Sequence, residues 1–339
     1  MSSDPLFIIG TERSGSNLLR VILNTHSRIA VPHPPHVMHW FGELEPRYGD
    51  LTQDHKLRRL VDDVLALLAV HIYPWDVPID PAQVVAAAKP RSLYGVTAAL
   101  YDRHLAHAGK GRWGCKSTFM VHHVDTVLAA HPGARFLWLV RDPRDVAASS
   151  RKSVFSPFHP VLTARLWVAQ QQEALALETR LPAESLLRVR YEDLLGDPPG
   201  VLARVCAFLD EPFEPDMLAF SETPDARKGA ALSESWAKTA QPVQANNSGK
   251  YRKDLSPTEI RQVEAVARPV METLGYALED PGVGPLVTGL PRELAWRAMD
   301  RIWHLRVEWR SLRNDSNHWR RWGRRLRMSA IHLRSRFYR

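Results

Sequence analysis

The feature that most constrains the fold is a short apolar run followed at once by a glycine-bearing loop. Residues 6–9 are all apolar, as expected of a buried strand, and Gly10 and Gly15 follow with four residues between them. Apolar residues then recur at the spacing of one helix face: Leu18, Leu19, Ile22 and Leu23. A strand, a loop and a helix in this order aim backbone N–H groups at a phosphate. The sequence therefore predicts an anion-binding loop.

The loop departs from the version found in nucleotide triphosphatases. That version places Lys and then Ser or Thr after the second glycine, to hold the terminal phosphates and Mg²⁺. Here Ser16 and Asn17 stand there, and the cation of the loop is Arg13. The loop thus suits a phosphate-like anion rather than Mg-ATP hydrolysis. A P-loop kinase or nucleotidase remains the alternative, although it would also need a magnesium-holding carboxylate that is not evident.

Strand and helix patterns alternate along the chain. Residues 135–140 form a second continuous apolar run, and Asp142 and Pro143 after it can cap and start a helix. Residues 186–191 read as a further strand, and residues 51–70 and 92–107 as helices. This alternation predicts an α/β fold with a P-loop-like parallel sheet flanked by helices. Three shorter segments complete the pattern: an extended proline-rich loop at 30–40, a long polar loop at 222–253, and a helix that starts with a capping box at 256–259.

Bulk composition excludes several classes of protein. Of 339 residues, 45% are hydrophobic and 24% charged, which is ordinary for a globular chain. No run approaches the ~20 apolar residues of a membrane span, and no signal segment precedes the first strand, so we expect a cytoplasmic protein. Two cysteines are too few for a disulfide framework or a cysteine zinc site. We expect no metal, because the adjacent His122 and His123 would point apart on a helix.

The positive charge is concentrated at the C-terminal end. Residues 292–339 hold fourteen arginines and four acids, a net +10, whereas the whole chain carries +8. The remaining residues are therefore slightly acidic, and we expect no nucleic-acid binding. The Gly- and Pro-rich stretch 282–291 reads as a linker. We accordingly divide the chain into a domain at 1–285 and a helical extension at 286–339.

The extension has the pattern of two amphipathic helices with a break at residues 314–317. Apolar residues recur at helical spacing on either side of the break: Ala295, Met299, Ile302, Leu305, Trp309 and Leu312, then Trp319, Trp322, Leu326, Ala330, Leu333 and Phe337. Arginines occupy the other faces, and five of the eleven tryptophans lie here. The pattern fits a helix pair lying on an anionic membrane surface. It also fits a hairpin packed on the body or on another subunit.

Three motifs together resemble one enzyme family. Residues 10–19, 140–149 and 189–194 are similar in type, order and spacing to sulfotransferases that use 3′-phosphoadenosine 5′-phosphosulfate (PAPS), in particular to bacterial members with the pattern shared by Golgi enzymes. The basic run 250–253 extends the resemblance to about residue 275. It implies transfer of a sulfuryl group from PAPS, as co-substrate, to an acceptor hydroxyl on a small molecule, glycan or lipid.

The resemblance assigns the donor site. The first motif would hold the 5′-phosphosulfate: Arg13, Ser14, Gly15, Ser16 and Asn17. The second would hold the 3′-phosphate through Arg141 and Ser149, with Lys250 and Arg252 closing over it. One cation and one hydroxyl suit a dianionic phosphate, and this second anion site separates PAPS from ATP. The alternatives are an ion pair of Arg141 with a neighbouring acid, Asp142 or Asp145, and a solvated surface for the late basic run.

The resemblance also assigns catalytic roles, with one departure. Lys116 matches a lysine that neutralises the departing phosphate, and Arg13 would assist it. Cytosolic relatives have a catalytic histidine two residues beyond that lysine, where this chain has Thr118. Bacterial relatives often carry a glutamate on the loop after the first helix, where this chain has His33 and His36.

A histidine titrates near neutrality and can take a hydroxyl proton, so we predict His36, and next His33, as the general base. Because the glutamate is missing, a non-catalytic, membrane-associated anion-binding protein remains a second alternative.

Overall fold

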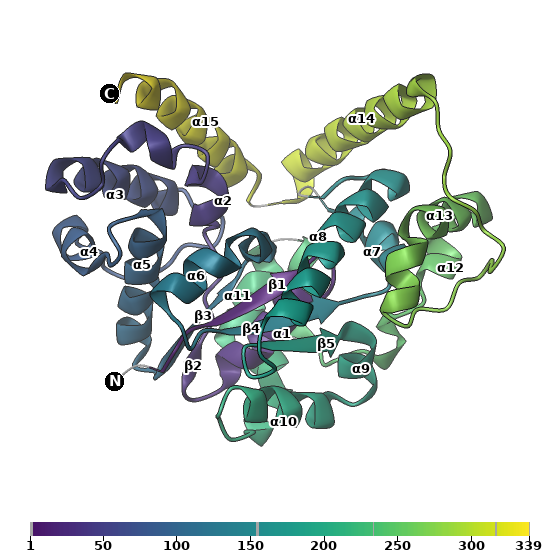
Figure 1. The fold of residues 1–339 in the computed structure, drawn as a ribbon, viewed down its shortest axis with the longest axis horizontal. Helices are drawn as coiled ribbons and strands as arrows, with labels where there is room; N and C mark the ends of the chain where they lie inside the picture. The colour runs from purple at the N-terminus through teal and green to yellow at the C-terminus, as the bar shows by residue number, and fades with distance from the viewer. Residues whose placement is uncertain (1–2, 154–155, 233, 316, 339) are drawn as a thin grey trace.

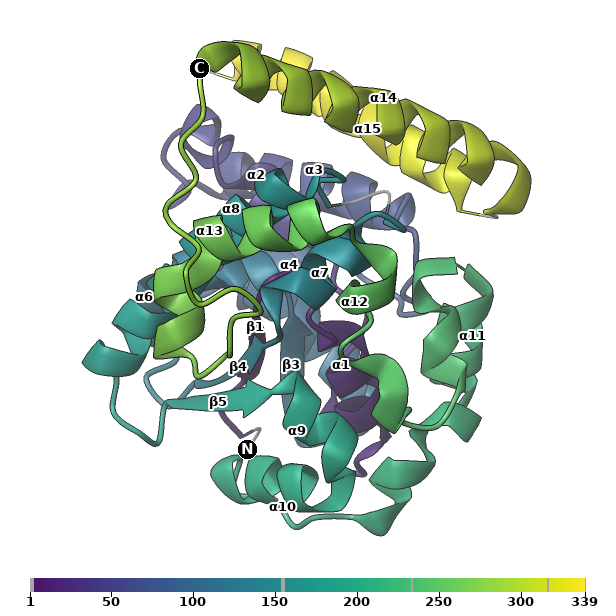
Figure 2. The ribbon, with the colours of Figure 1, turned by 90° about the vertical axis from the view of Figure 1, so that its right-hand side faces the viewer.

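The computed structural model describes residues 3–153, 156–232, 234–315 and 317–338. Five parallel strands form one sheet in the order β2-β3-β1-β4-β5 (Figure 1). The strands are β1 (Leu6–Gly10), β2 (Ile29–Ala30), β3 (Arg112–Lys116), β4 (Arg135–Val140) and β5 (Leu186–Arg190). Helices lie on both sides of the sheet (Figure 2), so the predicted α/β class and parallel sheet are confirmed.

The helical elements surround this sheet and continue beyond it. The α-helices are α1 (Ser16–Thr25), α2 (Val37–Phe41), α3 (Asp54–Ala69), α4 (Pro81–Ala87), α5 (Leu93–Ala108), α6 (Val124–Ala130), α7 (Pro143–Ser150), α8 (Pro160–Arg180), α9 (Tyr191–Gly196), α10 (Pro198–Phe208), α11 (Pro224–Leu232), α12 (Tyr251–Asp254), α13 (Pro257–Thr273), α14 (Leu290–Asn314) and α15 (His318–Arg334). Short 3₁₀ segments are η1 (Glu45–Tyr48), η2 (Thr118–His123), η3 (Pro215–Glu222), η4 (Glu234–Ala240), η5 (Ala245–Asn247) and η6 (Ser335–Phe337).

Each central strand supplies both hydrophobic layers. Phe7 and Ile9 of β1 pack with buried residues of α3, α5 and α13 on one face. Leu6 and Ile8 pack with α1 and α10 on the other face. Successive side chains of a strand point to opposite faces, and a sheet covered on both sides therefore needs continuous apolar strands. This requirement explains why continuous apolar runs predicted β1 and β4.

The strand order brings the sequence motifs to one edge. β1 pairs in parallel with β3 on one side and with β4 on the other, so the order in which the chain adds strands to the sheet changes side at β1. Ligands of open α/β sheets bind at such a switch point, beyond the carboxyl ends of the strands. The residues that follow these strands are the loop 11–15, Ser117, Arg141 and Tyr191.

Two glycines of the loop after β1 are required by geometry. Gly10 has φ +135°, and a Cβ there would lie 2.4 Å from the carbonyl oxygen of Leu139. Gly15 has φ +92°, and a Cβ there would lie 2.3 Å from the ring of Tyr191. Positive φ values and close approaches of this kind are accessible to glycine alone without strain. The spacing of the two glycines is thus fixed by close neighbours on β4 and α9.

Several helix starts follow their sequence signals. The side chain of Asp142 accepts a hydrogen bond from the Arg144 amide at 2.8 Å, and Pro143 begins α7 as predicted. Ser256 and Glu259 form a complete capping box at the start of α13. The helices predicted at 51–70 and 92–107 are α3 and α5, with ends shifted by a few residues.

Other segments were predicted wrongly. Residues 222–253 are not one long loop, because they include α11, η4, η5 and α12. The buried residues of α11 are the small Ala226 and Gly229, which give no apolar stripe for a sequence pattern to detect. The proline-rich loop at 30–40 ends in the short helix α2.

The C-terminal helices form a V above the body (Figure 1), seen edge-on in Figure 2. The predicted break separates α14 from α15, although Ser316 within it lies outside the described residues. Trp303 of α14 stacks on Phe158 at 4.4 Å between ring centroids. Met328 and Ile331 of α15 belong to the main hydrophobic core. None of the described helices combines the length and apolarity needed to cross a membrane.

The division at residue 285 stays a prediction, and Ile331 offers a test of it. Ile331 is fully buried, whereas Leu333 on the same helix is 61% exposed. Replacing Ile331 by Ala should lower the free energy of unfolding by about 2–5 kcal/mol, as for other buried aliphatic residues. Leu333→Ala, the matched control, should change it by less than about 0.5 kcal/mol. Denaturant titration measures both, and equal effects would show that α15 contributes nothing to the stability of the body.

Candidate active site

The two predicted donor motifs meet at the switch point. The guanidinium of Arg13 donates through Nε to the Ser149 hydroxyl at 3.1 Å, across 136 residues of sequence. Arg141 in turn donates to the backbone carbonyl of Arg13 at 2.9 Å. Arg13 itself has φ +69°, a conformation uncommon for a side chain larger than glycine. The loop is therefore held in its shape by residues at the end of β4 and on α7.

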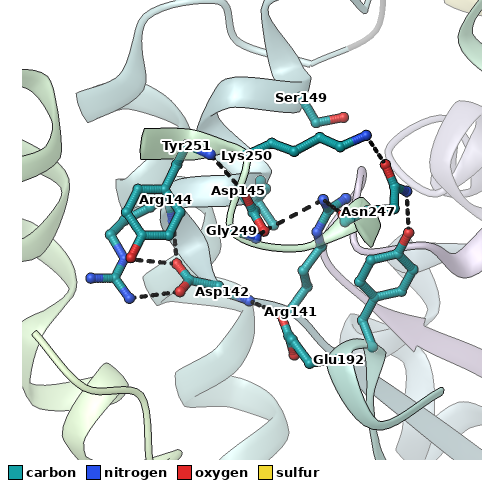
Figure 3. Close-up of polar contacts among 12 residues, drawn as sticks. Arg141, Asp142, Arg144, Asp145, Ser149, Glu192, Asn247, Gly249, Lys250 and Tyr251 are labelled. Atoms are coloured by element: carbon teal, nitrogen blue, oxygen red, sulfur yellow. Dashed lines mark hydrogen bonds and ion pairs between the residues drawn. The ribbon is translucent and has the colours of Figure 1, made fainter. Parts of the chain in front are cut away.

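Arg141 lies among groups that leave part of its charge unpaired. Its guanidinium stands 4.4 Å from the centroid of the Tyr191 ring and donates to the Asn247 carbonyl at 3.1 Å. The alternative ion pair with Asp145 is present at 3.7 Å, but that carboxylate also accepts from two backbone amides, as Figure 3 shows. The buried Nε of Arg141 has no partner among the described residues.

Asn247 connects the late basic segment to this cluster. Its side-chain oxygen accepts from Lys250 at 2.8 Å and from Lys238 at 2.7 Å, and its amide donates to the Tyr191 hydroxyl at 2.6 Å. Figure 3 shows Lys250 and Arg141 both extending toward Asn247. Burial and the neighbouring Lys250 lower the pKa of Lys238 to about 8. Sequence analysis missed Lys238, because it lies on a short 3₁₀ segment without a motif.

The other predicted donor residues have varied surroundings. Ser14 is buried, and its hydroxyl has no partner among the described residues. Ser16 begins α1 directly after Gly15, and Asn17 accepts a hydrogen bond from Arg20 at 2.9 Å. Arg252 forms an ion pair with Glu279 at 2.6 Å and is 62% exposed. Its guanidinium is therefore committed to a surface partner rather than to the Asn247 cluster.

Lys116 and Glu12 are partly buried groups of opposite charge beside the loop. Burial lowers the pKa of Lys116 to about 8, although the nearby Glu12 opposes this shift. Burial also raises the pKa of Glu12, whose carboxylate accepts from the Ser156 hydroxyl at 3.0 Å. No sequence signal pointed to Glu12, because it is a loop residue next to Arg13 and belongs to no motif of its own. Its position makes it a carboxylate near the expected reaction centre.

Positive charge exceeds negative charge at this edge of the sheet. Burial and the charge of Arg141 lower the pKa of Arg13. Lys116, Lys238 and Lys250 add further ammonium groups to the same region. Cations that are even partly withdrawn from water and lie close together are costly unless an anion neutralises them. The geometry is thus that of a site for a polyanionic ligand.

His36 lies next to the lysine at the end of β3. Its Nδ1 is 2.9 Å from the hydroxyl of Ser117, and its ring meets Phe119 edge-on at 5.6 Å. Its backbone has φ +56°. Burial, and after it the charge of Lys116, holds the pKa of His36 well below its usual range. These surroundings favour the neutral imidazole, the form that can accept a proton, while they also weaken it as a base.

His33 is enclosed in an aromatic cluster. Its ring lies 4.4 Å from Trp236 and 5.4 Å from Tyr73 between centroids, and its Nδ1 is 3.3 Å from His71. Burial and the neighbouring His71 keep its pKa well below the usual range. The structure thus separates the two predicted bases: His36 contacts the residue after Lys116, and His33 packs among rings. Within the described parts of the chain, no three His, Cys, Asp or Glu side chains gather as metal ligands would.

The fold and this edge of the sheet suit an enzyme that binds a polyanionic ligand, and comparison with known proteins gives its family. The chain belongs to the sulfotransferase family, whose model matches residues 5–215. Protein-tyrosine sulfotransferase A of Caenorhabditis elegans is 23% identical over 90% of this chain and 74% of its own length. Protein-tyrosine sulfotransferase 1 of Danio rerio is 24% identical over 85% of this chain and 76% of its own length. The reaction class is therefore sulfuryl transfer.

Solved structures share the fold. The sulfotransferase domain of the Synechococcus PCC 7002 olefin synthase has a TM-score of 0.57 and 22% identity, covering 82% of this chain and 96% of that domain. The sulfotransferase domain from the curacin biosynthetic pathway has a TM-score of 0.55 and 20% identity, covering 82% and 100%. The family match ends before α14 and α15, so these two helices lie outside the part that defines the family.

Proposed function

We propose that this enzyme transfers a sulfuryl group from PAPS to an acceptor hydroxyl. The observation that carries the proposal is the meeting of Arg13, Ser149 and Arg141 at one sheet edge with an excess of buried positive charge. PAPS carries a phosphosulfate and a separate 3′-phosphate, and each part of this cluster suits one of them. The two curated relatives are named for protein tyrosine, which is itself a hydroxyl acceptor.

In this proposal the residues divide the chemistry between them. Loop amides and Arg13 hold the phosphosulfate, as a helix N-terminus holds an anion. His36 removes the acceptor proton while the acceptor oxygen bonds to sulfur and the bond from sulfur to the phosphate oxygen breaks. Lys116 stabilises the charge that develops on the departing adenosine 3′,5′-bisphosphate. The negative charge of the bound donor also counters Lys116, which otherwise disfavours a proton on His36.

Binding of the donor product tests the 3′-phosphate site. Wild type should bind adenosine 3′,5′-bisphosphate more tightly than AMP, which lacks the 3′-phosphate. Arg141→Gln should reduce this difference by about 1.5–3 kcal/mol, the contribution of a charge-assisted hydrogen bond. Arg261→Gln, which removes an exposed arginine paired with Asp280, is the control. Calorimetry measures each affinity. Tighter binding of Mg-ATP than of the bisphosphate would favour the kinase alternative.

Turnover of His36→Ala tests the assigned base. Its rate should fall by roughly 10²–10⁴, as expected on loss of a general base, while donor affinity is kept. Transfer of sulfur label from PAPS to acceptors in a fractionated host extract measures the rate. His55→Ala, on the exposed surface of α3, is the control. The turnover rates of His33→Ala and Glu12→Gln are compared with that of His36→Ala. A normal rate in His36→Ala with a lost rate in Glu12→Gln would transfer the role to Glu12. A wild-type chain that binds donor without any transfer would favour the non-catalytic alternative.

We also propose that α14 and α15 attach the enzyme to an anionic membrane surface on the cytoplasmic side. The apolar residues opposite the packed face of each helix are exposed: Ile302, Leu305, Trp309 and Leu312 on α14, and Trp319, Trp322, Leu326 and Leu333 on α15. Arginines flank both stripes, as in helices that lie in the headgroup region. An enzyme attached in this way could act on a lipid or on an acceptor bound to the same membrane surface.

The four acids of the extension are engaged inside the protein, so they do not neutralise its exposed arginines. Glu293 pairs with Arg165, and Asp300 accepts from the backbone amides of residues 158 and 159 at 2.7 and 2.8 Å. Glu308 pairs with Arg325 at 2.7 Å, and Asp315 pairs with Arg321. All four acids are thus engaged within the protein. Each remaining arginine near an anionic surface contributes about 1 kcal/mol of attraction.

Vesicle binding tests the membrane proposal. The full chain should sediment with vesicles of phosphatidylglycerol at low salt, less so at high salt, and not with phosphatidylcholine alone. Trp309→Glu combined with Leu326→Glu should abolish binding without changing the melting temperature. Leu218→Glu, an exposed leucine of the body, is the control. Unchanged binding in the double variant would remove these stripes from the interface. A wild-type chain that ignores the vesicles would make the extension a packing or assembly element.

A further inference from the structure

Arg324 of α15 is a buried cation without a counter-ion. Only 8% of the residue is exposed, and it forms no hydrogen bond or ion pair with any described residue. Its Nε is fully buried. Burial, with the like charges of Arg325 and Arg321, lowers the pKa of Arg324 to about 10. A buried guanidinium N–H without an acceptor is costly, so this position calls for an anion that the described residues do not supply.

Arg324 lies beside the histidines of the candidate active site. Its guanidinium stands 5.0 Å from the centroid of the Trp40 ring on α2, and Trp40 meets His39 at 5.3 Å. His39 stacks at 3.8 Å on Phe119, the residue against which His36 packs. The charge of Arg324 also lowers the pKa of His36, His39 and His71, after the larger effect of burial. A continuous row of rings thus joins Arg324 to the proposed base.

Further unpaired donors surround Arg324. The buried Nε1 of Trp40 has no partner among the described residues. On α15, Arg321 pairs with Asp315 through one nitrogen, but its Nε and second Nη have no partner there. The cation–π contact with Trp40 stabilises the charge of Arg324 but satisfies none of its N–H groups. Unpaired donors from two separate elements, α2 and α15, therefore lie close together around the contact between Trp40 and Arg324.

We propose that Arg324 and Trp40 bind an anionic group, a phosphate or a carboxylate, carried by the acceptor whose hydroxyl faces His36. The acceptor would then be an anionic alcohol or phenol rather than a neutral one. This inference rests on the proposed sulfuryl transfer, because it assigns the substrate class of the same site. It also gives the extension a second role: α15 closes the acceptor side of the site and supplies the cation that selects the acceptor.

Binding of small acceptor analogues tests the subsite. With the donor site saturated by adenosine 3′,5′-bisphosphate, calorimetry compares phenyl phosphate with phenol. Wild type should bind phenyl phosphate at least about tenfold more tightly, and Arg324→Gln should lose about this factor. Arg324→Lys should keep part of it, because the charge remains. Arg327→Gln, which removes an exposed arginine of the same helix, is the control.

A second pair of probes identifies the source of the anion. Monomeric dihexanoyl phosphatidylglycerol is compared with glycerol 3-phosphate under the same conditions. Tighter, Arg324-dependent binding of the lipid assigns the subsite to a lipid headgroup, and equal binding assigns it to a soluble phosphate. If Arg324→Gln does not fold, Trp40→Phe takes its place in the test. This variant keeps an aromatic ring and removes the Nε1 donor, and it should weaken the binding of phenyl phosphate severalfold.

Two results would overturn the proposal. One is equal affinity of wild type and the Arg324 or Trp40 variants for phenyl phosphate. The other is a wild type that prefers phenol. Failure of the donor assignment looks different: the bisphosphate would then not bind, while phenyl phosphate binding would still depend on Arg324. The two proposals are therefore separated by one set of titrations.

Discussion

An excess of buried positive charge at one edge of the sheet is the constraint on which the rest of the structure depends. The parallel strands place Arg13, Lys116 and Arg141 at neighbouring strand ends, where their charges repel one another. The groups that contact these cations are mainly backbone carbonyls, the ring of Tyr191 and the side chain of Asn247, and carboxylates are fewer than cations here. These partners hold the cations in place but leave their charge largely uncompensated, so the site favours a ligand with several negative charges.

The C-terminal helices change how this site is understood. The family match stops before them, yet α15 supplies Ile331 to the core and Arg324 to the surroundings of the active-site histidines. One helix thus has a packed face that stabilises the body and an opposite, exposed face with apolar residues. The two readings of the extension taken from its sequence, packing and membrane attachment, apply to different faces of the same helix and do not exclude each other.

The sequence predicted most of the fold and the motifs that meet at the sheet edge, for physical reasons. Doubly buried strands need unbroken apolar runs, and the loop between Gly10 and Gly15 has a spacing that few structures share. The histidine environment was not predictable, since it depends on contacts such as that between His33 and Trp236, which are distant in sequence. Glu12, Lys238 and Arg324 were missed for a related reason: they stand out through their shifted pKa values and, for Arg324, through an unpaired Nε, and neither property leaves a pattern along the chain.

The contact between Gly15 and Tyr191 has a consequence for engineering. The tyrosine ring fills the space of a missing Cβ, stacks under Arg141 and reaches Asn247 with its hydroxyl. One side chain therefore sets the distance between the loop, the end of β4 and the late segment. Libraries that vary the loop alone would sample only side chains compatible with this ring. Altered donor preference should instead be sought by varying positions 15 and 191 together, as one linked pair in the search.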